Sequence, residues 1–211
     1  MEITEIFASI QGESTLQGLP CVFVRLTGCN LDCSYCDTRY ARENGTSMTH
    51  DEILSKIASY SIPYVCLTGG EPLLQTDTPA LAEKLIANGY AVSVETNGSL
   101  DASVLQLKSK RVIDIKCPGS GEYEKNFYGN VTDRRSTDEF KFVITDRNDF
   151  DFACSIANKY DLLPDTILLF SPAWKQIDSQ LLAKWIINEQ PGVRMHVQIH
   201  KYIWPTESRG R

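Results

Sequence analysis

The sequence has no long hydrophobic run, no visible targeting signal and no internal repeat. None of its apolar stretches approaches the roughly 20 residues that a membrane-spanning helix needs. The first five residues, Met1-Glu2-Ile3-Thr4-Glu5, are acidic and lack the basic start of a secretory signal peptide. From these absences we expect a cytoplasmic protein that does not contact a membrane.

Positive charge is also scarce. The 211 residues include 21 Lys and Arg against 27 Asp and Glu, a formal net charge of −6. Because nucleic-acid binding depends on cations that neutralise phosphates, this balance argues against a nucleic-acid partner and favours a small-molecule substrate. An apolar content of 42% and a charged content of 23% are typical of a globular protein. The length fits one domain, which we expect to span residues 1–211.

Seven cysteines are present, and three of them are close together. Cys29, Cys33 and Cys36 have a C-x3-C-x2-C spacing and follow the apolar run Cys21–Leu26, so we expect them on one loop after a strand. Thiolates favour zinc, copper(I) or iron–sulfur clusters. A closed zinc site needs four protein ligands, and a cubane cluster usually has four cysteines. Three thiols on one loop therefore predict a metal centre with one open coordination position, unless a distant fourth ligand completes it.

Short β-rich runs alternate with helical patterns along most of the chain. This alternation predicts parallel strands joined by right-handed crossovers. The first strand lacks a following Gly-x-Gly-x-x-Gly turn, which argues against a dinucleotide-binding fold. Polar residues instead follow nearly every strand, as on the active face of a (β/α) barrel. We expect an α/β fold, a single-domain incomplete (β/α) barrel of about six units with parallel strands. The expected strands are 21–26, 64–67, 91–95, 112–116, 139–144, 166–170 and 193–199, and the expected helices are 50–60, 79–88 (with Thr78 as N-cap), 102–108, 149–160 and 178–189.

The cysteine spacing, with Tyr35 just before the last cysteine, resembles the radical S-adenosylmethionine (SAM) superfamily. The resemblance implies that Cys29, Cys33 and Cys36 hold a [4Fe–4S] cluster and that SAM chelates its fourth iron. An electron from a reductant such as flavodoxin or ferredoxin would then cleave SAM to methionine and a 5′-deoxyadenosyl radical. The segment Gly69-Gly70-Glu71-Pro72 follows a strand, and the resemblance implies that it receives the amino group of SAM.

Further SAM contacts are implied at the ends of several strands. Glu95 and Asn97 could bind ribose hydroxyls, although a helix cap or an ordinary turn would also account for them. The segments 116–121 and 170–173 are also expected to approach SAM, and the alignment with family members is least secure over 116–130. The full predicted SAM set is Tyr35, Cys36, Asp37, Gly70, Glu71, Glu95, Asn97, Lys116, Cys117, Pro118, Phe170, Ser171, Pro172 and Ala173.

Several segments together narrow the resemblance to the 7-carboxy-7-deazaguanine synthase family. The family converts 6-carboxy-5,6,7,8-tetrahydropterin to 7-carboxy-7-deazaguanine with loss of ammonia, a lyase step toward queuosine and related 7-deazapurines. The resemblance implies that the adenosyl radical takes hydrogen from C6 of the pterin, that the ring contracts, and that hydrogen returns so that SAM is regenerated. We also expect a homodimer. The segments that carry the resemblance are 6–14, 18–20, 23–26, 28–31, 36–38, 68–75, 94–98 and 200–201.

The same resemblance assigns a substrate and magnesium site. Arg25 is a charge in an apolar strand, so it reaches solvent, pairs with an internal Asp or Glu, or binds an anion such as the pterin carboxylate. Thr38, by its position an ordinary turn residue, is implied to bind Mg²⁺, and a role for Asp37 beside it stays open. Arg209 or the C-terminal carboxylate could close the pocket. The predicted substrate contacts are Ile10, Gln11, Gly12, Glu13, Arg25, Thr68 and His200, although a lone histidine is more often structural.

Two other functions would fit parts of this sequence. An activase that places a glycyl radical on a partner protein would share the cysteine loop and the cluster, but would not need Gln11-Gly12-Glu13 or Arg25. A zinc-stabilised binding module would need a fourth ligand from elsewhere in the chain. Metal content and substrate turnover separate the three possibilities.

Overall fold

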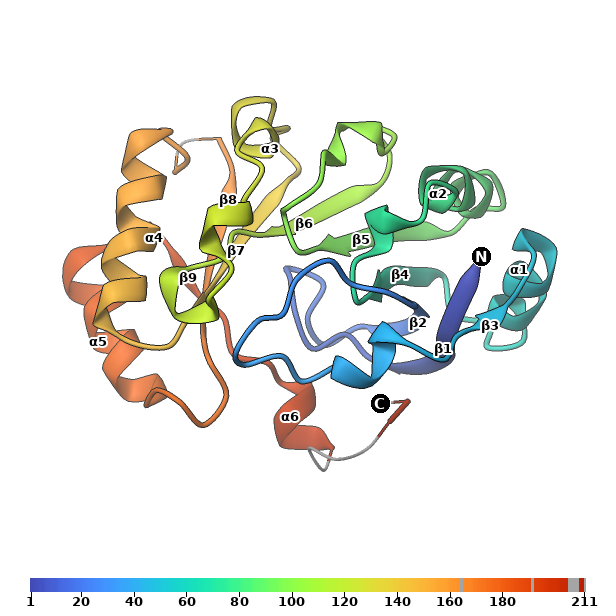
Figure 1. Cartoon of the computed structure of the whole chain (residues 1–211), viewed down its shortest axis with the longest axis horizontal. Helices are drawn as coiled ribbons and strands as arrows, with labels where there is room; N and C mark the ends of the chain where they lie inside the picture. The colour runs from blue at the N-terminus through green and yellow to red at the C-terminus, as the bar shows by residue number, and fades with distance from the viewer. Residues whose placement is uncertain (164, 191, 205–208, 211) are drawn as a thin grey trace.

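In the computed structural model, which describes residues 1–163, 165–190, 192–204 and 209–210, one curved sheet carries helices along its outside (Figure 1). The nine strands of the described residues run in the order β3-β1-β2-β4-β5-β6-β7-β8-β9, and the two ends of this order do not join. The strands are β1 (Glu2–Ile10), β2 (Pro20–Leu26), β3 (Thr46–Ser47), β4 (Tyr64–Gly69), β5 (Ala91–Thr96), β6 (Lys110–Asp114), β7 (Glu139–Ile144), β8 (Ile167–Pro172) and β9 (Arg194–Met195). The helices are α1 (His50–Ala58), α2 (Thr78–Ala87), α3 (Gly129–Thr132), α4 (Arg147–Lys159), α5 (Ser179–Glu189) and α6 (His200–Ile203).

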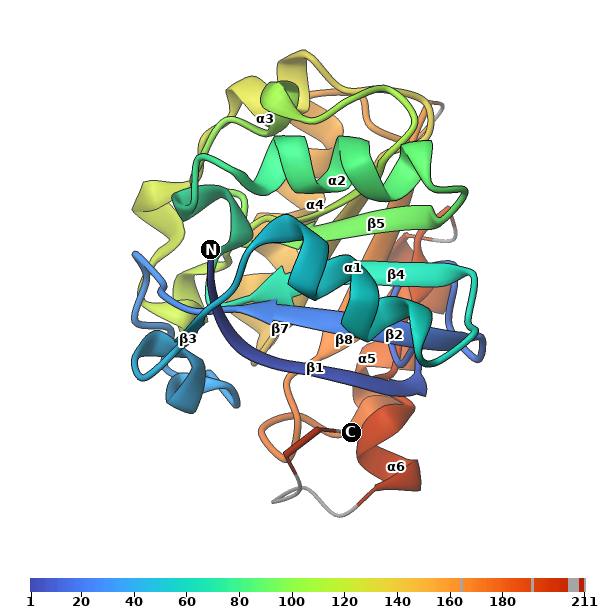
Figure 2. The same cartoon turned by 90° about the vertical axis from the view of Figure 1, so that its right-hand side faces the viewer.

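Neighbouring strands from β2 to β9 are all parallel, while β1 pairs with β2 and β3 in the antiparallel sense. Six crossovers connect the parallel strands of the described chain, and five of them carry an α-helix. Figure 2 shows α1 and α2 along the outer side of β4 and β5. The predicted α/β architecture, an open and incomplete barrel, is therefore confirmed.

Three local predictions were wrong, and the elements β1, β3, α3 and α6 were not predicted. The expected strands do not include β1, an edge element whose residues are mostly half-buried and therefore give a weak hydrophobic pattern. Residues 102–108 form only a 3₁₀ turn over Ala102–Val104, because Val104 and Leu107 are exposed and the segment has no continuous apolar face packed on the core. The expected strand 193–199 pairs with β8 only at Arg194–Met195, because the backbone beyond it bonds to the N-terminal loop. The N-cap of α2 is Asp77, one residue before the expected Thr78.

The helix α1 illustrates how sequence sets an outer element. The side chain of Thr49 accepts from the amide of Glu52 at 3.3 Å, and the carboxylate of Glu52 accepts from the amide of Thr49 at 2.8 Å. This capping box satisfies two amides that the helix leaves free. Ile53 and Ile57 are fully buried on the inner face, and each such burial contributes about 1.5–3 kcal/mol.

Alternation along the strands separates the core from the interior of the barrel. Val24 and Leu26 of β2 are fully buried in the core that the strands share with the outer helices. Phe23 and Arg25 point the other way, as successive side chains of a strand must. The register places Arg25 beside Thr68 of β4, so the two share the inner face. Inner-face residues toward the carboxyl ends of the strands are thus brought around one space. No helix of the described residues has the length and apolar character needed to cross a bilayer.

Candidate functional site

A cavity of about 350 Å³ lies at the carboxyl ends of the parallel strands. Its volume is in the range of small-molecule sites. It joins the two halves of the predicted site, the cysteine loop with the Gly-Gly turn and the Gln-Gly-Glu segment with Arg25. The predicted residues that line it are Ile10, Gln11, Gly12, Glu13, Arg25, Cys29, Cys33, Tyr35, Cys36, Asp37, Thr38, Thr68, Gly70, Glu95, Asn97, Lys116, Ala173 and His200.

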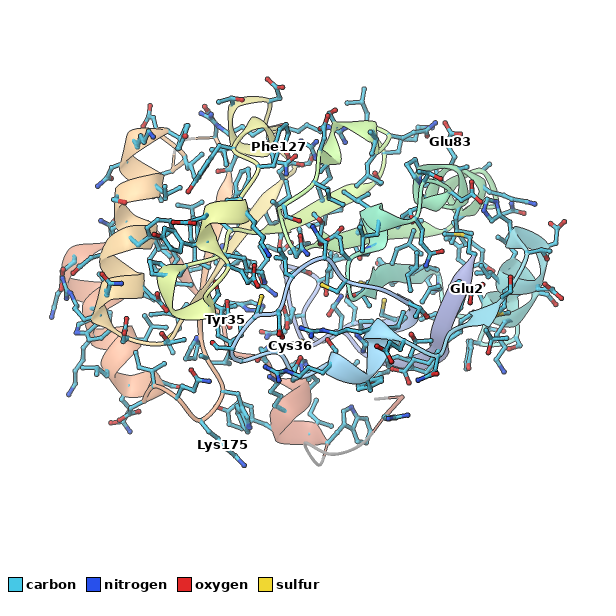
Figure 3. The ribbon with its side chains drawn as sticks, viewed as in Figure 1. Glu2, Tyr35, Cys36, Glu83, Phe127 and Lys175 are labelled. Carbon is cyan, nitrogen blue, oxygen red and sulfur yellow. The ribbon has the colours of Figure 1, made fainter. Side chains whose placement is uncertain are left out.

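The cysteine loop runs across the middle of the molecule, where Figure 3 marks Tyr35 and Cys36. Cys29, Cys33 and Cys36 are free thiols, and all three line the cavity. The loop is held at its start by a bond from the amide of Gly28 to the carbonyl of Ala41 at 2.9 Å, and in its middle by a turn between Cys36 and Cys33 at 3.2 Å. The three thiols are thereby presented to one space by main-chain bonds.

The donor set fits an iron–sulfur cluster better than a single metal ion. Within the described residues, no group of three or more His, Cys, Asp or Glu side chains converges to hold one ion. In a cubane each thiolate binds a different iron atom, so thiols that share a cavity need not meet at one point. The amide nitrogen of Asn97 lies 3.8 Å from the sulfur of Cys29, a donor of the kind that tunes cluster sulfur. The described residues therefore provide no closed zinc site with four protein ligands.

The Gly-Gly-Glu turn packs directly against the cysteine loop. A side chain at Gly70 would collide with the carbonyl of Gly28, so only glycine permits this approach. The amide of Glu71 donates to the same carbonyl at 2.8 Å. The Glu71 carboxylate is fully buried and accepts from the Asn97 amide at 2.6 Å and the Thr96 hydroxyl at 2.8 Å. Burial raises the pKa of this carboxyl although these bonds oppose the shift.

Glu71 therefore anchors the turn to β5, and its side chain does not line the cavity. Five further residues of the predicted SAM set, Cys117, Pro118, Phe170, Ser171 and Pro172, also do not line it. The ring of Phe170 is fully buried against Phe142 and Phe150, on the helix-facing side of β8. Cys117 is equally buried in the same core. Both side chains therefore face the core and not the cavity, and a contact of these two residues with SAM stays a prediction.

The other half of the cavity is organised around Glu95. Its carboxylate accepts from the side-chain amide of Gln11 at 3.2 Å and from the hydroxyl of Thr68 at 3.4 Å. Burial, together with the nearby charge of Glu13, raises the pKa of Glu95. The bond to Gln11 ties the segment after β1 to β5, so the antiparallel strand contributes a wall to the cavity.

His200 lies close over Gly12, where a side chain would collide with its imidazole ring. The amide of Ile199 donates to the carbonyl of Gly12 at 3.2 Å, which fixes the start of α6 on this loop. Burial lowers the pKa of His200. The close packing of His200 therefore requires glycine at position 12. His200 lies at the cavity, and its contact with the substrate stays a prediction.

Arg25 has an internal acidic partner. Its Nε lies 2.8 Å from Oε1 of Glu5, and the pair is largely enclosed. The guanidinium also lies over the ring of Phe7 at 5.7 Å. Because Arg25 lines the cavity as well, an internal ion pair and an anion site are both compatible with its position.

Thr38 lies two residues after the last cysteine, with its hydroxyl 3.9 Å from the sulfur of Cys36, and it lines the cavity.

Asp37 beside it pairs with Lys201 of α6 at 2.6 Å, an ion pair that joins the cysteine loop to the C-terminal segment. Arg209 lies over the ring of Tyr40 at 4.6 Å. The C-terminal carboxylate, on residue 211, lies outside the described residues.

Sequence reasoning missed several charged residues of the cavity. Asp114 of β6 accepts from Lys116 at 3.0 Å, while Lys141 of β7 lies between Asp114 at 3.4 Å and Glu13 at 2.5 Å. The signal was present, since a charge at alternate positions of an apolar strand is the same pattern that singled out Arg25. The other unpredicted polar residues of the lining are Thr96, Trp174, Gln198 and Lys201.

The comparisons with known proteins agree with this geometry. Residues 23–115 match the family model described as Radical SAM superfamily. The chain is 42% identical over 213 residues to the 7-carboxy-7-deazaguanine synthase of Chlorobaculum tepidum, covering 100% of this chain and 97% of the relative. It is 39% identical over 225 residues to the enzyme of that name from Koribacter versatilis, covering 100% of each. The fold is similar to the crystal structure of QueE from Escherichia coli, with a TM-score of 0.79, 20% identity and 93% of each chain covered. This chain therefore belongs to the 7-carboxy-7-deazaguanine synthase family of the radical SAM superfamily.

Proposed function

We propose that this chain converts 6-carboxy-5,6,7,8-tetrahydropterin to 7-carboxy-7-deazaguanine with loss of ammonia, as a radical SAM lyase of 7-deazapurine biosynthesis. The observation that carries the proposal is the single cavity that joins three cavity-facing thiols to Gln11, Glu13 and Arg25. Membership of the superfamily implies a [4Fe–4S] cluster and SAM. Bound at Cys29, Cys33 and Cys36, the cluster with SAM would supply the radical that takes hydrogen from the substrate.

The chain's own residues would bind and orient the two small molecules. Gly70, which lies against the cysteine loop, leaves room and main-chain groups for the amino acid part of SAM. The guanidinium of Arg25 would bind the pterin carboxylate, because its planar fork matches a carboxylate. Glu13 would accept from the N–H edge of the pterin ring. The enclosed strand walls would keep water from the reacting centre.

Magnesium is a further part of the proposal. Thr38 lines the same cavity as Arg25, so its hydroxyl could bind a Mg²⁺ ion that also meets the substrate carboxylate. Such an ion keeps most of its waters and needs few protein oxygens. It would orient the carboxylate and stabilise negative charge that develops beside it. A cytoplasmic homodimer that receives electrons from flavodoxin or ferredoxin completes the proposal.

Turnover by reconstituted protein tests the function. The anaerobic protein is supplied with dithionite, SAM, Mg²⁺ and carboxytetrahydropterin, and the deazaguanine is sought by ultraviolet absorption and mass spectrometry. We expect the product only when all components are present. Lack of product, together with a radical formed on a partner protein, would instead favour a glycyl-radical activase.

The metal centre is tested on the same preparation. We expect iron and sulfide in a ratio typical of a cubane, and an EPR spectrum of the reduced protein that changes when SAM is added. Zinc in the place of iron and sulfide would reject the radical chemistry and support a binding module.

A further inference from the structure

We propose that Lys141 is a positioning residue for substrate recognition, which holds Glu13 ionised and turned toward the N–H edge of the substrate ring. This inference rests on the proposed function and adds a residue that acts on the substrate through another side chain. It is drawn from the charged residues that line the inner faces of β6 and β7.

The geometry places Lys141 between two carboxylates. Its ammonium group lies 2.5 Å from Oε2 of Glu13 and 3.4 Å from Oδ2 of Asp114. The side chain of Lys141 is 11% exposed, and so is that of Glu13, so the pair is largely withdrawn from solvent yet lies on the cavity wall. The second carboxylate oxygen of Glu13 accepts from the side-chain amide of Gln198. Each oxygen of Glu13 thus has one protein donor that fixes its direction.

This arrangement leaves acceptor capacity for a ligand. A carboxylate has about four lone-pair positions, of which Lys141 and Gln198 occupy two. One position on each oxygen is therefore available to two parallel N–H groups, such as those of a 2-amino-pyrimidinone edge. The amide of Glu13 donates to the side chain of Gln11 at 3.0 Å, so the main chain at Glu13 is also fixed. Only the ionised carboxylate accepts on both oxygens, because a protonated one would place a donor against a donor.

Lys141 supplies the main charge that keeps Glu13 ionised. The charged groups facing Glu13 are Lys141 from β7, Glu95 from β5, His196 after β9 and His200 from α6. Burial alone would raise the pKa of the Glu13 carboxyl, but Lys141, with smaller effects from the two histidines, brings it below its ordinary value. The histidines cannot replace the lysine, since burial lowers their own pKa values and leaves them neutral near pH 7.

The test compares Lys141→Met with wild type across pH 6 to 9. Without the ammonium group, burial and the charge of Glu95 outweigh the remaining hydrogen bond from Gln198 and raise the pKa of Glu13. A protonated Glu13 no longer accepts two N–H groups, so we expect the substrate KM at pH 7 to rise tenfold or more, with a smaller change in kcat. The KM of Lys141→Met should approach that of wild type as pH increases and Glu13 ionises. In wild type, Glu13 stays ionised from pH 6 to 9, so its titration should not change the KM over this range. Iron content and SAM cleavage without substrate should match wild type.

Three companion variants make the result specific. Lys141→Arg retains the cation and should restore most of the affinity. Adding Glu13→Gln to Lys141→Met removes the titrating group, so the pH dependence should disappear. Lys84→Met is the control, because Lys84 pairs with exposed Asp51 at 2.6 Å and does not line the cavity. This variant should leave the KM and its pH profile unchanged.

Two results would overturn the inference. One is a Lys141→Met enzyme with the wild-type KM at every pH, measured while wild type turns the pterin over. The other is a loss of equal size at all pH values that tracks a lower thermal midpoint, which would make Lys141 a purely structural residue. If the wild-type protein forms no product, the proposed function itself fails. Failure of the inference about Lys141 can therefore be distinguished from failure of the proposed function.

Discussion

The Nε of Arg25 lies 2.8 Å from Oε1 of Glu5, and the hydroxyl of Tyr40 donates to the same oxygen at 2.8 Å. Within the described chain, the side chain of Arg25 donates a hydrogen bond from Nε, and its guanidinium group lies over the ring of Phe7. The two terminal nitrogens therefore keep their donors for a ligand in the cavity that Arg25 lines. Glu5 balances the charge of Arg25, and the two terminal nitrogens of the guanidinium group can bind a carboxylate of the substrate.

Arg25→Ala should raise the substrate KM by about tenfold or more, the effect of losing one charged hydrogen-bonded contact. Arg25→Lys should lie between wild type and Ala, because it keeps a charge but not the fork. Steady-state kinetics with carboxytetrahydropterin measure both. An unaltered KM in Arg25→Ala would confine Arg25 to the internal pair with Glu5.

The sequence predicted those parts of the site whose residues are near neighbours in the chain. The three cysteines, the Gly-Gly turn and the Gln-Gly-Glu segment are each local patterns that a loop or turn must satisfy. The pairs Lys141–Glu13 and Lys201–Asp37 are separated by well over 100 residues, and only strand order and register bring them together. The same limit applies to Phe170, whose ring faces the core. Which side chains of a strand face the core and which face the cavity depends on its register in the sheet, and the composition of the strand does not reveal it.

Thr38→Ala should keep the cluster but lose activity or its dependence on Mg²⁺. The hydroxyl of Thr38 lies 3.9 Å from the sulfur of Cys36, close to the cluster loop but not among its thiolates. Iron content and the EPR spectrum should therefore match wild type, while the Mg²⁺ titration of turnover flattens. Thr38→Ser retains a hydroxyl oxygen and should restore the response. A Thr38→Ala enzyme with the wild-type Mg²⁺ titration would remove this residue from the magnesium site.

Glu71→Ala should destabilise the fold, and lower SAM affinity as a consequence. The buried Glu71 carboxylate accepts from Thr96, Asn97 and the amide of Leu73, so its removal leaves buried donors unpaired. We expect a loss of about 2–4 kcal/mol in unfolding free energy, which corresponds to a thermal midpoint lower by about 5–15 °C. Glu83→Ala, on the exposed side of α2 (Figure 3), is the control and should change the midpoint little. Weaker SAM binding with an unchanged midpoint would show that the Glu71 side chain contacts SAM itself.

Glu95→Gln should stabilise the protein by an amount that increases with pH. Burial and the charge of Glu13 raise the pKa of the Glu95 carboxyl above its ordinary value of 4.5. At pH values between 4.5 and the raised pKa of the folded state, the folded protein binds more protons than the unfolded chain. The stability that Glu95 contributes is therefore present below pH 4.5 and is lost as pH rises through the folded pKa. The amide cannot ionise, and it can still bond to Gln11 and Thr68.

Thermal midpoints of the Glu95→Gln and wild-type proteins, measured from pH 4.5 to 8, test this linkage. The difference in favour of the variant should be near zero at the acid end and reach about 1–3 °C at neutral pH, which is under about 1 kcal/mol for a chain of this size. Because Glu95 is only half-buried, water screens the charge and keeps the effect small. Glu83→Gln makes the same chemical change in solvent and should show no such slope. A difference that stays constant with pH would mean that Glu95 ionises as readily in the folded chain as in the unfolded one, and its bonds to Gln11 and Thr68 would then be those of an ordinary carboxylate at the cavity wall.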